Sequence, residues 1–315
     1  MIIVRTMNAG MCNQLFTYAY ARFLAEKKEQ EILLDYSHTN AADMKHHAMY
    51  EDALSHFDLK CGNIITDPSE YRILAGRSGV GLERLLQPIL VRRKNRTSYA
   101  INQEARKGER LWKEGIGLNL LAENCPEYFT QQLVPNVVLF GYWQTPQYAR
   151  QLESILREEL IAPVEKEGAI AVMRKRMKQE ESVCVHIRRG DYIGNGMHEV
   201  CNDKYYHSAM EQYRQELQNP HFYIFSDDKN YVKEHYQSGN DDVTVMAEKT
   251  KDYEELILMS GCRHFIISNS SFSWWAQFLS GSKDVIAPAK WYHDANKKSL
   301  LYEDFWELLP VEEEQ

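Results

Sequence analysis

The second half of the chain alternates short apolar runs with helical stretches. Runs rich in β-branched and aromatic residues stand at 183–188, 222–227, 243–246, 264–269 and 284–288. Stretches with helical spacing separate them at 203–219, 229–238, 252–261 and 271–280. Because parallel strands need helical crossovers, this alternation predicts a doubly wound α/β domain whose ligands bind at the carboxyl ends of the strands.

The first half begins in the same way. Residues 1–4 and 31–36 are typical of strands, and 15–28 keeps helical spacing between them. The region from Ser37 to about Arg110 carries a poor signal, after which 137–144 and 145–160 are typical of a strand and a helix. We therefore expect two Rossmann-like α/β lobes with a cleft between them.

The expected boundaries follow from a hinge-like segment at 161–169. They are 1–165 for an N-terminal lobe and 166–290 for a C-terminal lobe, followed by a short helix and acidic tail at 291–315. A chain of 315 residues is long enough for two cores.

The net charge and the pattern of cysteines exclude some classes of function. The formal net charge is -8, so neither nucleic acid nor an anionic bilayer is expected as a global partner. The six cysteines are scattered without a CxxC pair, no signal peptide begins the chain, and no segment approaches the ~20 apolar residues of a membrane span. A cytoplasmic protein is expected. The basic segment 82–96 allows weak peripheral contact at the inner membrane face, although a solvated segment is the favoured interpretation.

The stretch "HIRRGDY" follows the first strand of the second lobe. Arg188 and Arg189 repel each other there unless an anion lies beside them, and guanidinium groups match phosphate oxygens bidentately. A diphosphate is one interpretation. The other is a pair of surface arginines, one of them paired with Asp191.

Two further strand ends point to the same edge. Asp227 and Asp228 could accept hydrogen bonds from a guanine, or could cap the following helix. Asn269, Ser270, Ser271 and Ser273 stand at a strand-to-helix turn that favours an anion, or that forms an ordinary cap. Trp274 and Trp275 are assigned to packing.

Familiar catalytic motifs are missing from the sequence. It holds no Walker loop, no GxGxxG after the first strand and no DxD of the metal-binding kind. The adjacent His46 and His47 are more typical of solvated residues than of metal ligands. A phosphate site built from arginines needs no metal, so neither a metal nor another cofactor is expected.

Four blocks of the sequence match one family. The blocks 10–25, 186–192, 225–228 and 252–279 strongly resemble the bacterial α-1,2-fucosyltransferases of glycosyltransferase family 11. The resemblance implies a two-lobed GT-B fold and an inverting, metal-independent transfer of L-fucose from GDP-fucose. The implied acceptor is the 2-hydroxyl of a terminal galactose on an oligosaccharide or lipid-linked glycan.

Residue roles are carried over by position. The resemblance implies that Arg188 holds the β-phosphate of the leaving diphosphate and that Arg189 supports it. His186 and either Asp227 or Asp228 meet the nucleoside. The remaining expected donor contacts are a phosphate cradle of Ser270, Ser271 and Ser273, and Asn13 and Gln14 from the first lobe.

The base that takes the acceptor proton stays open. Asp191 and His198 are candidates, Asp191 could instead only orient an arginine, and a loose mechanism without a base is a further alternative. The chain departs from the family at Ala9 and Cys12, which replace glycines, and at Glu199, which replaces the glycine after the His. Glu199 is a surface residue, an acceptor contact or a rival base. A catalytically degenerate module that only binds GDP or a glycan is the second functional hypothesis.

Overall fold

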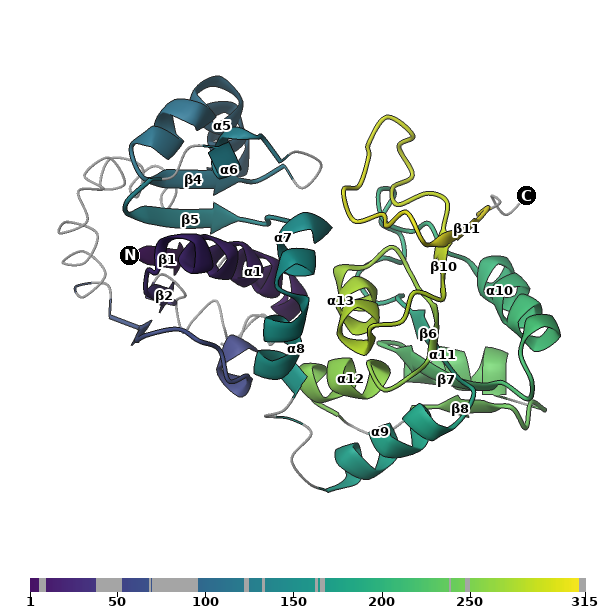
Figure 1. The fold of residues 1–315 in the computed structure, drawn as a ribbon. Helices are drawn as coiled ribbons and strands as arrows, with labels where there is room; N and C mark the ends of the chain where they lie inside the picture. The colour runs from purple at the N-terminus through teal and green to yellow at the C-terminus, as the bar shows by residue number, and fades with distance from the viewer. Residues whose placement is uncertain are drawn as a thin grey trace. The chain divides into compact units, whose positions relative to one another are not determined.

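The computed structural model divides into two compact units, Met1–Glu159 and Leu160–Gln315, each described here by itself (Figure 1). The structure describes residues 1–5, 10–37, 53–67, 69, 96–121, 125–131, 134–161, 164, 168–237, 239–246 and 250–311. His46, His47, Ala9 and the basic segment up to residue 95 lie outside these ranges.

The first unit contains a parallel sheet in the order β3-β2-β1-β5-β4. Its strands are β1 (Ile2–Arg5), β2 (Ile32–Asp35), β3 (Ile64–Ile65), β4 (Ile116–Asn119) and β5 (Val137–Gly141). Its helices are α1 (Met11–Lys28), the 3₁₀ turn η1 (Ala53–His56), α5 (Arg96–Lys113), α6 (Tyr128–Gln131), α7 (Pro146–Gln151) and α8 (Glu153–Ile161), the last of which crosses the boundary between the units.

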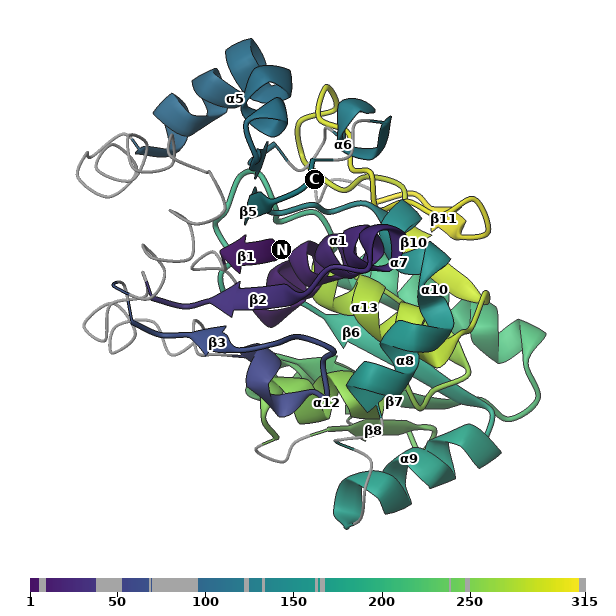
Figure 2. The same ribbon diagram turned by 60° about the vertical axis from the view of Figure 1, so that its left-hand side comes forward.

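Helices cover both faces of this first sheet. Leu111 of α5 packs with Ile3 and Val138 in a core on one face. Helix α1 lies along β1 (Figure 2) and is buried over most of its length, so it lacks the polar face of a surface helix. The βαβ start predicted from the sequence is confirmed.

The second unit contains a parallel sheet in the order β11-β10-β9-β6-β7-β8. Its strands are β6 (Ser182–Ile187), β7 (His221–Ser226), β8 (Val243–Val245), β9 (His264–Ile266), β10 (Val285–Pro288) and β11 (Glu307–Leu309). Its helices are α9 (Ala169–Gln179), α10 (Asp203–Glu216), α11 (Lys229–Val232), the π-helical turn η2 (Lys233–Gln237), α12 (Asp252–Met259) and α13 (Ser271–Ser280).

The order of the second sheet reverses at β6. The chain runs from β6 through β7 to β8 on one side and then returns to place β9, β10 and β11 on the other. Such a reversal is a topological switch point, where ligands of open α/β sheets bind beyond the carboxyl ends of the strands. The expected site residues follow the three adjacent strands β7, β6 and β9 at this point.

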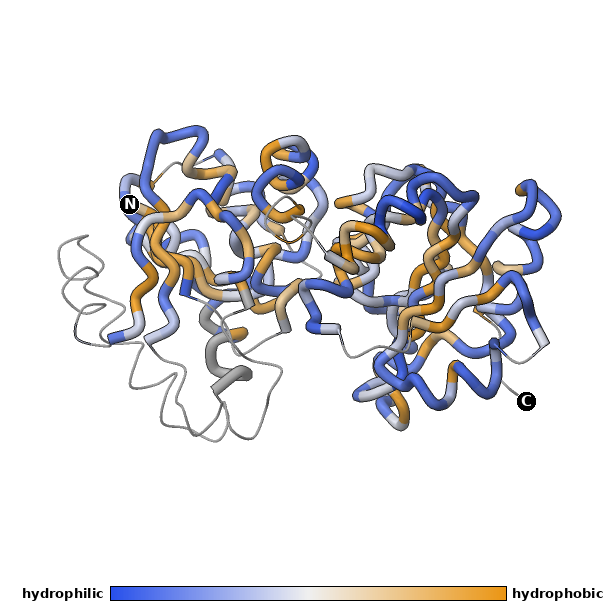
Figure 3. The backbone as a smooth tube through the Cα atoms, turned by 90° about the horizontal axis from the view of Figure 1, so that it is seen from below, coloured by the Kyte–Doolittle hydropathy of each residue, from blue (hydrophilic) through white to orange (hydrophobic). Residues whose placement is uncertain are grey.

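The two faces of the second sheet have different cores. Ile187 and Ile224 pack with Tyr206 and Met210 of α10 on one face. On the other face His186 contacts Ser273 of α13. Hydrophobic segments follow the strands inside each unit, while hydrophilic segments lie outside them (Figure 3).

The C-terminal segment differs from the expectation. A short helix was expected within 291–315, but the described part of that segment forms loops and β11, which pairs with β10 in parallel. Pro310 follows β11 directly and limits it to three residues, too few for a helix. The backbone groups at the edge of β10 need hydrogen-bond partners, so the segment pairs with β10 as a strand and does not form a helix.

The described residues contain no helix long and apolar enough to cross a membrane.

Candidate functional site

The ends of three neighbouring strands gather charged and polar side chains at the switch point. Arg188 and Arg189 follow β6, Asp227 and Asp228 follow β7, and Asn269 follows β9 by way of a short turn. The sequence-based expectation that these segments share one edge of the sheet is confirmed.

Arg188 is held by two carboxylates. Its Nη2 lies 2.6 Å from Asp191 Oδ1 and its Nη1 lies 2.9 Å from Asp227 Oδ2. Burial disfavours the charged guanidinium, but the charges of Asp227 and Asp191 outweigh burial and raise the pKa of Arg188. The side chain is a quarter exposed, so it is a fixed positive charge that a ligand can still reach.

Arg189 has a separate set of partners. Its guanidinium carbon lies 3.2 Å from the centre of the Tyr231 ring, and its Nε lies 3.3 Å from Asp228 Oδ2. The backbone N–H of Arg189 donates to Asp227 Oδ1 at 2.9 Å. Each arginine thus has its own counter-charge, which explains how two adjacent guanidinium groups are tolerated at this edge.

The two aspartates after β7 make different contacts. Asp228 caps α11 by accepting from the backbone N–H of Tyr231, as the capping interpretation expected for one of the pair. Asp227 instead holds both the side chain of Arg188 and the backbone of Arg189. A Cβ on Gly190 would lie 2.5 Å from Asp227 Oδ2, so a larger residue there would displace the Asp227 carboxylate from its present position.

His186 is buried and neutral. Burial, with the charge of Arg188 adding to it, lowers the pKa of His186 to about 3. Its Nδ1 lies 2.6 Å from Ser273 Oγ and 3.2 Å from Ser268 Oγ. Ser273 is fully buried, so it lies beneath His186, away from the surface position that a phosphate cradle requires.

The turn between β9 and α13 joins several loops. Asn269 Nδ2 donates to the carbonyl oxygens of His198 and Trp291, at 3.0 and 2.8 Å. Ser270 is the N-cap of α13 and accepts from the N–H of Phe272. Ser271 follows at the first, half-buried position of the helix, where backbone N–H groups favour an anion.

The three candidate bases lie on the loop between β6 and α10. Asp191 is bound to Arg188, and the Glu199 carboxylate accepts from the N–H of Gly194 at 2.8 Å. His198 lies between the rings of Tyr192 and Tyr292, at 5.2 and 5.6 Å. Burial, reinforced by Lys297 and opposed by Asp191, lowers the pKa of His198.

The residues expected from the first lobe lie on α1. Asn13 Oδ1 accepts from Gln144 Nε2 at 2.5 Å, and Gln14 Oε1 accepts from the Tyr36 hydroxyl at 3.1 Å. Cys12, where the family has glycine, is buried in the same turn.

Two side chains with notable surroundings were not singled out by the sequence analysis. Tyr231 supports Arg189, but nothing in the sequence distinguishes it from other helical tyrosines. Glu255 on α12 was also missed, and burial raises its pKa to about 7. Lys229 opposes that shift, while Asp252 and Asp227 add to it. Among the described residues, no group of three or more His, Cys, Asp or Glu side chains could hold a metal ion.

Comparisons with known proteins concern the family and the fold of the chain. Residues 126–308 match the family described as Glycosyl transferase family 11. An α-1,2-colitosyltransferase of Escherichia coli is 32% identical over 166 residues, which cover 50% of this chain and 57% of that protein. The human galactoside α-(1,2)-fucosyltransferase 1 is 28% identical over 142 residues, which cover 42% and 38%. The chain spans about half the length of the curated relatives it matches.

The fold also matches solved structures. The fucosyltransferase NodZ from Bradyrhizobium superposes with a TM-score of 0.53 at 12% identity, over 91% of this chain and 94% of that one. The structure of the α-1,6-fucosyltransferase NodZ soaked with GDP-fucose gives 0.52 at 13% identity, over the same shares of the two chains. The expected GT-B-like class of two parallel α/β units is confirmed.

Proposed function

Because the chain belongs to glycosyl transferase family 11, we propose that it transfers L-fucose from GDP-fucose to the 2-hydroxyl of a terminal galactose, with inversion. The acceptor is a galactose-terminated oligosaccharide or lipid-linked glycan. The names of its relatives support this proposal, since they describe α-1,2 transfer of fucose or of colitose.

The position of Arg188 carries the proposal. Two carboxylates hold this guanidinium at the switch point, so its orientation is set before a ligand arrives. Breaking the bond between fucose C1 and the phosphate oxygen leaves negative charge on GDP. A fixed positive charge stabilises that transition state more than the ground state and needs no metal ion.

The remaining donor contacts divide between nucleoside and diphosphate. His186 offers a neutral imidazole to the nucleoside, with Ser273 acting through it as a positioning residue. Asp227 or Asp228 also contacts the nucleoside. Ser270, Ser271 and Asn269 bring the N-terminus of α13 to the diphosphate, with Arg189 as support. The donor contacts expected at Asn13 and Gln14 stay predictions.

His198 is the proposed base. Asp191 and Glu199 are each committed to another group, namely Arg188 and the backbone of Gly194. A lowered pKa keeps the His198 imidazole neutral near pH 7, and a neutral imidazole has one ring nitrogen able to accept the acceptor proton.

We propose that the reaction takes place in the reducing cytoplasm, and the state of the cysteines supports this proposal. All six cysteines are free thiols, among them the buried Cys184 and Cys262, which is the state favoured in that compartment.

The test is GDP release by the purified protein in EDTA, with GDP-fucose or GDP-colitose as donor and a panel of β-galactosides as acceptors. We expect release that an acceptor stimulates, and a 1,2-linked product by NMR. GDP binding without release on every acceptor would instead support a degenerate binding module. Release that requires added metal would contradict the proposed charge stabilisation by Arg188.

A further inference from the structure

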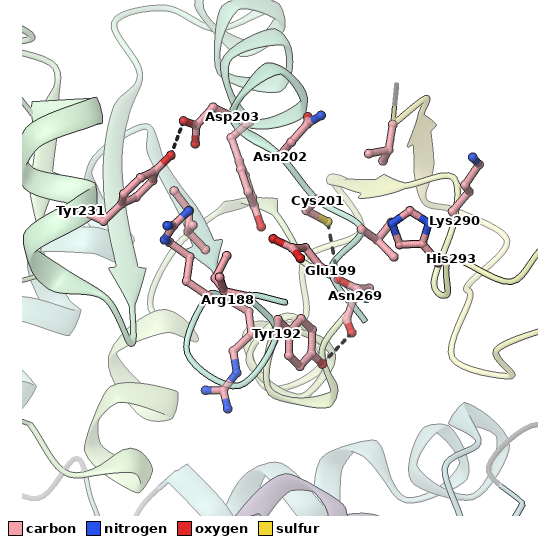
Figure 4. A pocket seen from close by; sticks show the side chains of 16 residues that line it. Arg188, Tyr192, Glu199, Cys201, Asn202, Asp203, Tyr231, Asn269, Lys290 and His293 are labelled. Carbon is pink, nitrogen blue, oxygen red and sulfur yellow. Dashed lines mark hydrogen bonds between the residues drawn. The ribbon is translucent and has the colours of Figure 1, made fainter. Parts of the chain in front are cut away.

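A pocket of about 530 Å³ includes the proposed donor contacts Arg188, Arg189 and Asn269 in its lining, but the proposed donor contacts do not account for the rest of that lining. It is formed within the second unit by the end of β6, the loop after it and the N-terminus of α10 (Figure 4). Ile187 lines the pocket and belongs to the core beneath α10, whereas His186 and Ser273 lie on the opposite face of the sheet. The pocket is therefore adjacent to the donor residues but separate from the nucleoside side.

Tyr206 contributes an unsatisfied hydroxyl to this pocket. Its side chain is only 1% exposed, and its hydroxyl has no oxygen or nitrogen partner among the described residues; only the thiol of Cys201, a weak hydrogen-bonding group, contacts it. A buried polar group without a partner is costly, and a hydroxyl can both donate and accept. Because Tyr206 also lines the pocket, a bound ligand is the natural partner for this hydroxyl.

The other lining groups define the ligand chemistry. Arg189 and Lys290 supply donors, and Glu199 supplies acceptor oxygens. Val200 and Val311 add apolar surface. Donors, acceptors and apolar patches in one small cavity suit a pyranose, which carries hydroxyls at its edge and C–H groups on its faces. The volume is within the usual range for small-molecule sites, about 300–1,000 Å³.

We propose that this pocket binds the sugar that precedes the terminal galactose in the acceptor, and that Tyr206 and Lys290 select it. This inference rests on the proposed function, which supplies the galactoside. Arg188 and Tyr192 are among the residues that line the pocket (Figure 4), so the pocket adjoins the arginine that we assign to the donor diphosphate.

The experiment compares acceptors with and without that second sugar. Initial rates are measured with lactose and with methyl β-galactoside for the wild type, Tyr206→Phe, Lys290→Ala and the double variant. Loss of one hydrogen bond should raise the KM for lactose about 3- to 10-fold. The KM values for methyl β-galactoside and GDP-fucose should not change.

Two matched variants separate binding from folding. Tyr213 lies on the same helix, but its hydroxyl donates to Asp284 at the opposite edge of the sheet, at 2.9 Å. Lys283 precedes β10, whereas Lys290 follows it. Tyr213→Phe and Lys283→Ala should leave the ratio of the two acceptor KM values unchanged. Tyr206→Phe should lower the urea midpoint little, since its hydroxyl loses only a weak contact with the Cys201 thiol.

The inference fails if the lactose KM is unchanged in the double variant, or if both acceptors lose affinity equally. Saturation-transfer NMR of lactose in the presence of GDP tests the pocket without turnover. If no acceptor stimulates GDP release but the double variant still abolishes the glucose signals, the proposed function fails and the pocket stands. If the glucose signals persist in the double variant, the pocket does not bind the second sugar, whether or not the protein catalyses transfer.

Discussion

At the scale of single residues, the role of Asp191 follows from its contact with Arg188. The 2.6 Å contact makes Asp191 an orienting carboxylate, with the proton transfer left to another group. Asp191→Asn should lower kcat about 10- to 100-fold, because a charge-assisted hydrogen bond is weakened. The pH-rate profile should keep its acidic limb. If that limb disappears with the carboxylate, Asp191 is the base and His198 is not.

Gly190 gives a second residue-scale prediction. Gly190→Ala places a methyl group against the Asp227 carboxylate, and we expect a loss of about 1–3 kcal/mol in the free energy of unfolding. GDP binding should weaken as well, since Asp227 holds Arg188. Gly196 is the matched control, because its added Cβ would meet nothing within 4 Å. Equal urea midpoints for the two variants would contradict the close approach.

At the scale of elements, a buried histidine joins the starts of three strands. His264 at the start of β9 lies 2.6 Å from Asp284 and 2.7 Å from Glu181, which precede β10 and β6. Burial opposes protonation, but the hydrogen bonds to Asp284 and Glu181 outweigh it and raise the pKa of His264.

The raised pKa makes this stabilisation depend on pH. It is fully present below the ordinary histidine pKa of 6.5 and is lost as the pH rises through the higher folded value. The wild type should therefore exceed His264→Gln in unfolding free energy by more at pH 6 than at pH 9, in urea titrations. A constant difference for His264→Gln would refute the linkage.

Elements with strong local signals were predictable from the sequence. Helix α13 occupies the expected range 271–280, because Ser270 caps it and Gly281 ends it with a positive φ of 81°. The single helix expected at 229–238 is α11 followed by the π-helical turn η2, in which Tyr236 donates to Asp203 of α10. That change depends on a tertiary contact, and periodicity carries no information about it.

At the scale of the whole molecule, the alternation of strands and helices predicted which polar residues meet at the carboxyl edge of the second sheet. Parallel strands place all their carboxyl ends together, so Arg188, Asp227 and Asn269 could be assigned to one site from sequence order alone. The pairing of each arginine with its own carboxylate could not be predicted, because it depends on side-chain directions. The burial of Ser273 was hidden for a similar reason: α13 is buried nearly all round, so the sequence marks no outward face.

The central claim is that Arg188 holds the β-phosphate of the donor. Calorimetric titration of GDP and GMP into the wild type and Arg188→Ala tests it, since GMP lacks that phosphate. Loss of a charged hydrogen bond should weaken GDP binding about 10- to 100-fold and leave GMP binding unchanged. If both nucleotides weaken equally, or neither does, Arg188 does not hold the β-phosphate and the proposed mechanism is wrong.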